Sequence, residues 1–294
     1  MCSIIIINQH HKEFPLIIAA NRDEDYNRPT SKVQILSREP HLIMGGKDEL
    51  KGGTWLAVNK HSLFVGITNQ GERNDKPGSR GHIVMNALKY CSSIEELLNF
   101  VEDINPSKFN GFNLVFGNQN VVFIAYSYLI HSMVIRELPK GINIITNDIK
   151  FNEENLKASY VHKKLDSVEK PWAEYYIILK RILNYYGDGV GLKIKPKKKD
   201  GKPYGSSTIS SSILAFDANG LARYKYYDRT DARPKRKEGE PFLPRYADYI
   251  DLWRGLVFGA RSPSEEGSNE IEDEETEQIA VPKDNLKETA SIYF

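Results

Sequence analysis

The sequence of 294 residues contains only two cysteines, Cys2 and Cys91. Two cysteines form at most one disulfide, so a secreted, disulfide-stabilised framework is not indicated. The N-terminus lacks a secretory signal, because its apolar run, Ile4–Ile7, is short and is followed by polar residues. No stretch approaches the ~20 apolar residues of a spanning helix. We expect a soluble protein of a reducing compartment, without stable membrane insertion.

A strong overall charge is also absent, since the formal net charge is +1. No global field therefore favours nucleic acid as a partner. The sequence has no phosphate loop, dinucleotide fingerprint or Gly-x-Ser-x-Gly motif. His41, His61, His82, His131 and His162 lack zinc-like spacing, so no metal site is expected. The hydrophobic fraction of 40% is nevertheless sufficient for a sizeable core.

The charge is unevenly distributed along the chain. Residues 193–203 contain six lysines and two prolines, which predicts an exposed basic loop. The alternative is a patch that binds an anionic ligand or surface. Residues 262–282 are acidic and poor in aromatic residues, which predicts disorder. We therefore expect one folded domain over residues 1–258 and an acidic, disordered tail over residues 259–294.

Secondary-structure signals occur in blocks. Strand-like runs occupy residues 3–8, 16–20, 54–58, 63–68, 112–116, 121–126, 132–138, 142–146, 212–216 and 221–227. Helical patterns occupy residues 81–90, 94–104, 153–167 and 172–186. Groups of hairpins that alternate with helix pairs do not suit a parallel βαβ fold. The order predicts an α+β class, with antiparallel sheets and helices packed outside them as a layered sandwich.

Cys2 has an unusual position. Methionine before a small residue is normally removed, which would make Cys2 the first residue of the mature chain. Its free α-amine would have a pKa near ~7.7–8.0. One residue would then supply both a nucleophile and a general base, as in N-terminal nucleophile enzymes. The alternative is that Cys2 only begins a buried strand.

The first hairpin predicts what lies opposite Cys2. If strand 3–8 pairs with strand 16–20, Cys2 faces position 21 or 22. Asn21, Arg22, Asp23 and Glu24 would then form a cluster beside the thiol. Arg22 is expected to lower the thiol pKa, Asp23 to hold the arginine or the α-ammonium, and Asn21 to donate to an oxyanion or a substrate carbonyl. The alternative is a surface ion-pair cluster that ends a strand.

Several motifs together resemble those of the NRDE family, also called the transport and Golgi organisation protein family. Cys2 and its apolar strand are followed by LIIAANRDEDYNRP. GGTWLAV at residues 52–58, GITN at residues 66–69, Arg80-Gly81 and NGFNL at residues 110–114 also match the family pattern. The resemblance extends from Met1 to about Arg229.

The resemblance implies a four-layer αββα sandwich of the N-terminal nucleophile hydrolase type. It implies catalytic candidates at Cys2, Arg22, Asp23, Asn69 and Asn147, and ligand-binding candidates at Asn21, Glu24, Arg28 and Trp55. Each asparagine also has a simpler interpretation as a turn-capping residue. The chain departs from the family at residues 204–212, where the arginine expected after Tyr204-Gly205 is missing.

The resemblance implies roles in Golgi organisation, protein secretion and the handling of haem or lipid metabolites. On this hypothesis a Cys2-centred cleft binds a small amphipathic molecule or haem, and His10, His11 or Cys2 is a candidate iron ligand. No other cofactor is expected, and protein partners are not predicted. The alternative is a cysteine amidohydrolase that cleaves a non-peptide C–N bond or a thioester. The expected location is the cytoplasm, with Golgi or mitochondrial association implied by the family.

Overall fold

The structure is a computed structural model that describes residues 2–70, 78–128, 132–147, 156–165, 170–187, 191–229 and 246–258. Met1–Arg261 form one compact unit. The predicted acidic tail, residues 259–294, lies outside the described residues, so its disorder and the domain boundary at 258 stay predictions.

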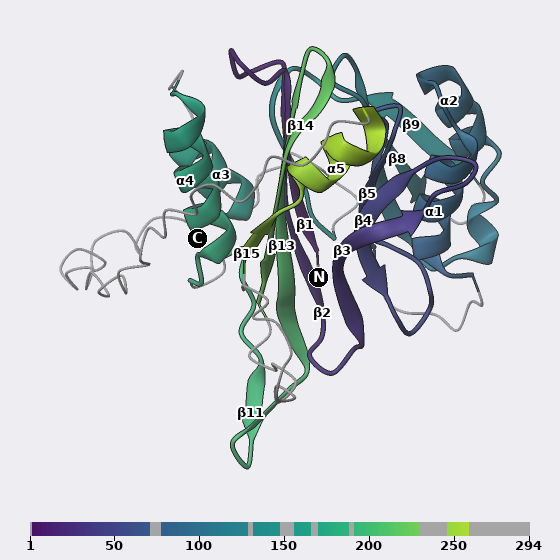
Figure 1. Cartoon of the computed structure of the whole chain (residues 1–294). Helices are drawn as coiled ribbons and strands as arrows, with labels where there is room; N and C mark the ends of the chain where they lie inside the picture. Colours follow the sequence, from purple (N-terminus) through teal and green to yellow (C-terminus); the bar gives the residue numbers. More distant parts are fainter. Residues whose placement is uncertain are drawn as a thin grey trace, which may run out of the picture. The chain divides into compact units, whose positions relative to one another are not determined.

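Most of the strands form two antiparallel sheets (Figure 1). The six-stranded sheet has the order β10-β1-β2-β13-β14-β15, from Gly141–Ile145, Ser3–Asn8, Leu16–Asp25, Ser206–Asp217, Gly220–Asp228 and Tyr246–Asp248. The seven-stranded sheet runs from β3 to β9 in chain order, from Thr30–Ser37, Ile43–Asp48, Leu56–Asn59, Phe64–Asn69, Phe112–Gly117, Val122–Tyr128 and Ser132–Glu137. A separate hairpin pairs β11 (Lys197–Lys199) with β12 (Lys202–Tyr204).

Helices cover the outer face of each sheet (Figure 1). α3 (Leu156–Leu165) and α4 (Trp172–Asn184) pack on the six-stranded sheet, where Val161 and Leu179 share one buried cluster with Ile5. α1 (Arg80–Tyr90) and α2 (Ile94–Glu102) pack on the seven-stranded sheet. A 3-10 turn, η1 (Pro106–Lys108), leads from α2 toward β7.

The inner faces of the two sheets enclose a third buried cluster. Ile4 and Ile6 of β1 contribute to it, together with Leu56 and Val115 of the opposite sheet. Since successive strand residues point to opposite faces, the apolar run of β1 needs cover on both sides. The four-layer αββα sandwich predicted from the sequence is therefore confirmed.

Several elements escaped the sequence patterns. β3, β4, β15 and α5 (Ile250–Phe258) were not predicted, although α5 buries Trp253 in the core between the sheets. β4 contains Gly45 and Gly46, which carry no strand signal. A Cβ on Gly46 would lie 2.2 Å from the Trp55 ring, so the packing of the sheet requires glycine there.

Other boundaries were wrong. The predicted strands at 16–20 and 212–216 are too short, because β2 extends to Asp25 and β13 begins at Ser206. The predicted basic loop at 193–203 includes an exposed hairpin that turns at Asp200 and Gly201. Helix 153–167 is described only as α3, and its predicted ends lie outside the described residues.

Candidate functional site

The candidate site lies where strand ends of both sheets meet. β1 begins at Ser3, next to Cys2, and its antiparallel neighbours β2 and β10 end at Asp25 and Ile145. In the other sheet, β4 and β6 end on this side and β7 begins there. Contacts that cross between the sheets join Asp48 at the end of β4 to Arg22, and Thr68 of β6 to Thr146. Motifs distant in sequence therefore converge around Cys2.

The predicted register of the first hairpin is confirmed. Ser3 pairs with Asn21, which places Cys2 opposite Arg22. The predicted single cluster is wrong, however, because residues 21–25 continue β2 and pair with β13. Alternation along the strand sends Arg22 toward the space between the sheets and Asn21 toward α3 and α4. The charged motif is therefore divided between two faces.

Two polar groups hold Cys2. Its backbone N–H donates to Oδ1 of Asn147 at 2.8 Å, and its Sγ lies 3.7 Å from the backbone oxygen of Asp23. The Cys2 residue is only 9% exposed. Of the candidates named from the sequence, Asn147 and Asp23 are thus the ones in hydrogen-bond contact with Cys2.

Asn147 is itself supported by a buried clamp that the sequence did not reveal. The neighbouring carbonyl of Thr146 accepts hydrogen bonds from Thr68 Oγ1 at 2.7 Å and from Asn113 Nδ2 at 3.0 Å. Gln70 Nε2 donates to Asn113 Oδ1 at 2.9 Å. These side chains belong to β6, β7 and the residue after β6, so the clamp ties the end of β10 to the opposite sheet. It fixes the backbone on which the Cys2 acceptor is mounted.

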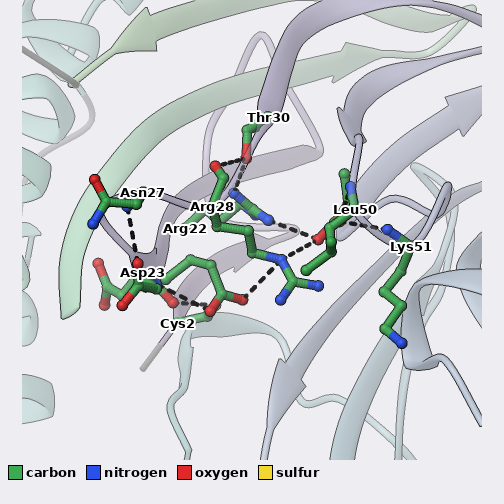
Figure 2. A network of polar contacts seen from close by, with 11 residues as sticks. Cys2, Arg22, Asp23, Asn27, Arg28, Thr30, Leu50 and Lys51 are labelled. Carbon is green, nitrogen blue, oxygen red and sulfur yellow. Dashed lines mark hydrogen bonds and ion pairs between the residues drawn. The ribbon is translucent and has the colours of Figure 1, made fainter. Parts of the chain in front are cut away.

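Arg22 forms a second connection between the sheets (Figure 2). Its guanidinium donates to Asp48 Oδ2 at 2.9 Å and to Thr30 Oγ1 at 2.6 Å. It also stacks on the Trp55 ring, with 4.3 Å between its Cζ and the ring centroid. Arg28 Nε donates to the same Asp48 oxygen at 2.7 Å. Asp48, which was not predicted, is therefore the common partner of both arginines.

The charges of this network constrain one another. Burial raises the pKa of Asp48, but hydrogen bonds from Arg28 and Lys51 outweigh it and hold the pKa below its usual value. Burial lowers the pKa of Arg22, while Asp48 and Glu24 oppose that shift. Glu24 contributes a longer ion pair to Arg28, at 3.6 Å. The expectation that Asp23 holds Arg22 is wrong, because Asp48 occupies that role.

Asp23 lies on the face of α3 and α4. Its Oδ1 accepts a hydrogen bond from Thr208 Oγ1 of β13. Burial raises the pKa of Asp23 to about 6, even though the hydrogen bond from Thr208 lowers it. Asp23 is therefore a carboxyl group that titrates close to neutral pH beside Cys2.

The Cys2 thiol is not activated in the way the sequence suggested. Burial raises its pKa, and the charge of Asp23 raises it further. Arg22 lowers the pKa, but its effect is the weakest of those that act on the thiol. The expected thiolate beside Arg22 is therefore not supported, because the arginine is committed to Asp48 and the thiol is desolvated.

Asn21 has a structural role. Its Nδ2 donates to the backbone oxygens of Leu183 and Leu192, at 2.9 and 3.0 Å. Its Oδ1 accepts from Ser211 Oγ, which in turn accepts from Arg229 Nε. Both donors of Asn21 are occupied, so the expectation that it donates to an oxyanion or a substrate carbonyl is not supported.

Asn69 remains outside these contacts. It ends β6, next to Thr68, and is half-buried. Among the described residues, no hydrogen bond connects its side chain to Cys2. Its role stays a prediction.

A pocket of about 300 Å³ opens beside the arginine network. Its lining includes Arg28 and Thr30 from the network, together with Tyr26, Tyr226 and Asp228. A ligand in this pocket would contact the Arg28 group that was predicted to bind one.

The histidines considered as iron ligands lie elsewhere. His11 follows β1 at the end opposite Cys2, so it cannot share a ligand with the thiol. Its Nδ1 accepts hydrogen bonds from the backbone of Glu13 and Phe14. Within the described part of the chain, no three His, Cys, Asp or Glu side chains are arranged to hold a metal ion.

The residues that support Cys2 and Arg22 include Trp55, Thr68 and Asn113, which belong to the motifs that resemble the NRDE family. A family model described as "Transport and Golgi organisation 2" matches residues 1–184, which is more than half of the chain. The chain belongs to this family. The resemblance noted from the motifs is confirmed.

Curated relatives carry the same name over a shorter stretch. The mouse protein "Transport and Golgi organization 2 homolog" is 29% identical over 106 residues, which are 35% of this chain and 38% of the relative. The human homolog is 28% identical over 108 residues, with the same coverage. The matched stretch thus spans well under half of these relatives.

A solved structure supports the fold. The Caenorhabditis elegans ortholog of N-acylethanolamine-hydrolyzing acid amidase has a TM-score of 0.51 and 12% identity, covering 73% of this chain and 92% of that one. At this identity the likeness concerns the fold alone. It agrees with the N-terminal nucleophile hydrolase type of sandwich. None of the described helices is both long and apolar enough to span a membrane.

Proposed function

We propose that this protein serves Golgi organisation and secretion by acting on a small amphipathic metabolite at Cys2. We propose that the chemistry is hydrolysis of a non-peptide amide or a thioester. The observation that carries the proposal is the hydrogen bond from the Cys2 nitrogen to Asn147 Oδ1, at 2.8 Å. After removal of Met1 this nitrogen becomes an α-amine, and Asn147 already orients it beside its own thiol.

In the first half of the reaction, the thiol proton moves to the Cys2 α-amine, and the sulfur attacks the carbonyl carbon. The carbonyl π pair moves to oxygen and gives a tetrahedral intermediate. When this collapses, the C–N bond breaks, and the leaving amine takes the proton from the ammonium. In the second half, water gives a proton to the α-amine and attacks the thioester carbon. The C–S bond breaks, the sulfur takes the proton back from the ammonium, and the acyl group leaves as the carboxylic acid.

The surroundings of Cys2 suggest how the other residues participate. An α-amine that donates one N–H to Asn147 keeps its lone pair for the thiol proton. Asp23 places a carboxyl of pKa about 6 near the same centre, where its charge would stabilise the ammonium. Asn69 is proposed as the oxyanion donor, in keeping with its place at the end of β6.

A second candidate function is binding without turnover, for example of haem or an acyl thioester. It is favoured by the raised pKa of the buried thiol, which keeps the nucleophile protonated near neutral pH. The pocket beside Arg28 would then hold the ligand. Under both proposals we place the protein in the cytoplasm, associated with the Golgi or mitochondria.

The distinguishing experiment combines intact-mass analysis with acyl labelling. The protein is treated with a β-lactone that carries a fatty acyl chain, and the acylated residue is mapped by mass spectrometry. We expect loss of Met1 and acylation of Cys2, followed by return to the unmodified mass as water releases the acyl group. Cys2→Ala should abolish labelling, and Cys91→Ala should leave it intact.

Asn147 supplies the sharper control. Asn147→Asp offers the amine a carboxylate acceptor in place of the amide, whereas Asn147→Leu removes the acceptor. Labelling that survives in the Asp variant and fails in the Leu variant supports amine orientation. Retention of Met1 in the active protein would exclude hydrolysis through the α-amine. Stable acylation without release would favour binding without turnover, as would spectral changes with haem that depend on Cys2.

A further inference from the structure

A basic hairpin extends from the end of the six-stranded sheet where β13 begins (Figure 1). It consists of β11 and β12, with Asp200 and Gly201 at positive φ in the turn. This backbone suits a tight two-residue hairpin turn. Residues 193–203 contain six lysines and one aspartate. The structure therefore concentrates positive charge on a narrow projection.

One face of this ribbon gathers the charge. Lys197 pairs with Tyr204, and Lys199 pairs with Lys202. Directly paired residues share a face, so Lys197, Lys199, Lys202 and Tyr204 point the same way. All four are exposed. Lys199 and Lys202 repel each other across the ribbon, an arrangement that is unfavourable without an anionic partner.

No such partner is present in the described part of the chain. Among the described residues, the three lysines of this face form no ion pair. By contrast, Lys47 and Lys225 elsewhere in the chain contact Glu49 and Asp248, each at 2.8 Å. The lysines of the hairpin are therefore available to an external anion.

Tyrosines extend this surface at the base of the hairpin. Lys195 stacks over the Tyr186 ring at 4.4 Å, and both Tyr186 and Tyr204 are exposed. Tyrosine places an apolar ring and a polar hydroxyl at a membrane interface, which is why it is enriched there. Lysine extends from apolar surroundings toward charged headgroups. The combination matches the boundary between water and an anionic bilayer.

We propose that the β11–β12 hairpin docks the protein peripherally on an anionic membrane surface. The hairpin face of Lys197, Lys199, Lys202 and Tyr204 would contact the phosphate and carboxylate groups of the lipids. This docking does not depend on the chemistry at Cys2. It would, however, bring the candidate site close to amphipathic substrates, because Ser206, two residues after the hairpin, pairs with Asp25 at the end of β2.

A membrane fits this projection better than a nucleic acid does. Residues 193–203 carry six lysines and one aspartate in a chain whose net charge is only +1. A long polyanion binds along an extended basic stripe, whereas the charge of this face is confined to one short ribbon. A planar bilayer would be contacted mainly by the tip of a projecting ribbon. Attraction to anionic lipid also falls off within a Debye length, which suits contact through a tip.

The test is co-sedimentation of the full chain with vesicles at low ionic strength. One set contains phosphatidylcholine alone, and the other contains 30 mol% phosphatidylserine. The triple variant K197Q/K199Q/K202Q is compared with K60Q/K108Q/K140Q, which removes the same charge from three exposed lysines elsewhere. Each lysine near the membrane contributes roughly fivefold to partitioning, so the hairpin triple should lose on the order of a hundredfold.

We expect binding to the phosphatidylserine vesicles only, loss in the hairpin variant and near-wild-type partitioning in the control variant. Tyr204→Ser alone should also weaken binding relative to the wild type. Cys2→Ala should bind like the wild type, which separates docking from the proposed reaction. Equal effects of the two triple variants would overturn the proposal. Equal binding to neutral vesicles would also overturn it. So would hairpin-dependent binding to a single-stranded RNA 20-mer without binding to vesicles.

Discussion

Replacement of Asp48 by alanine is the most direct test of how the two sheets are held together at the site. Asp48 Oδ2 is shared by Arg22 and Arg28, at 2.9 and 2.7 Å. The Arg22 side chain is only 4% exposed, so Asp48→Ala leaves a buried guanidinium without its carboxylate. Breaking a buried ion pair costs about 3–5 kcal/mol. We expect about 3 kcal/mol, at the lower end, because Asp48 itself retains 13% exposure.

Urea unfolding followed by tryptophan fluorescence measures this cost. With an m value near the upper end for single domains, a loss of about 3 kcal/mol lowers the midpoint by roughly 1 M. The double variant Arg22→Met/Asp48→Ala removes the stranded charge together with its partner. It should therefore be more stable than the sum of the two single substitutions predicts.

Glu49→Ala is the matched control. Glu49 adjoins Asp48 in sequence and pairs with Lys47 at 2.8 Å on the surface, where solvent screens the interaction. The urea midpoint of the Glu49→Ala variant should therefore stay at the wild-type value. If Asp48→Ala and Glu49→Ala shift the midpoint equally, Arg22 is not held by a desolvated pair, and the reasoning about the network fails.

Three further predictions concern the rest of the site. Burial raises the pKa of Asp23 to about 6, so protonation of this carboxyl favours the folded state. The unfolding free energy of the wild type relative to Asp23→Asn, measured in urea, should therefore fall by roughly 2 kcal/mol between pH 4 and pH 7. Thr68→Val removes one donor to the Thr146 carbonyl and should lower the free energy of unfolding by about 1–2 kcal/mol. It should also slow acylation of Cys2, and Thr68→Ser should restore both. Unchanged labelling would refute a positioning role. Gly53→Ala would place a Cβ 2.6 Å from Gly81 and should cost about 1–3 kcal/mol in thermal unfolding, whereas an unchanged Tm would show that the two backbones separate without penalty.

The first hairpin shows what the sequence predicts well. The apolar run from Ile4 to Ile7 and the segment from Leu16 to Ala20 fix the register through local pattern and loop length. The same rules placed Cys2 opposite position 21 or 22, and in the structure the residue opposite is Arg22. The layered sandwich also followed from the alternation of hairpins and helix pairs. These inferences succeed because each rests on short stretches of chain.

The site itself was predicted less completely, for two physical reasons. The NRDE segment was expected beyond the end of a strand, but the serine-rich start of β13 pairs with it and extends β2 to Asp25. Strand alternation then separates Arg22 from Asp23. Secondly, Asp48 reaches Arg22 across the interior from the other sheet. A contact of that kind depends on how the sheets stack, and no local pattern encodes it.

The family motifs acquire a physical meaning from these contacts. Trp55 of the GGTWL segment supports the Arg22 guanidinium, at 4.3 Å. Thr68 of the Thr-Asn pair and Asn113 of the NGFNL segment both bind the Thr146 carbonyl. Each motif therefore supports a neighbour of Cys2, and none of these three side chains is in hydrogen-bond contact with Cys2 itself.

It follows that the shared motifs constrain the position of Cys2 more closely than they constrain its chemistry. The clamp fixes Asn147, and Asn147 fixes the nitrogen of Cys2 at 2.8 Å. The Cys2 N–H precedes the first pair of β1 with β2, at Ser3, so the strand ladder offers it no partner. Asn147 supplies the acceptor that a buried N–H requires. The covalent state of this nitrogen, an amide with Met1 in place and an amine without it, is therefore the variable on which the two candidate functions divide.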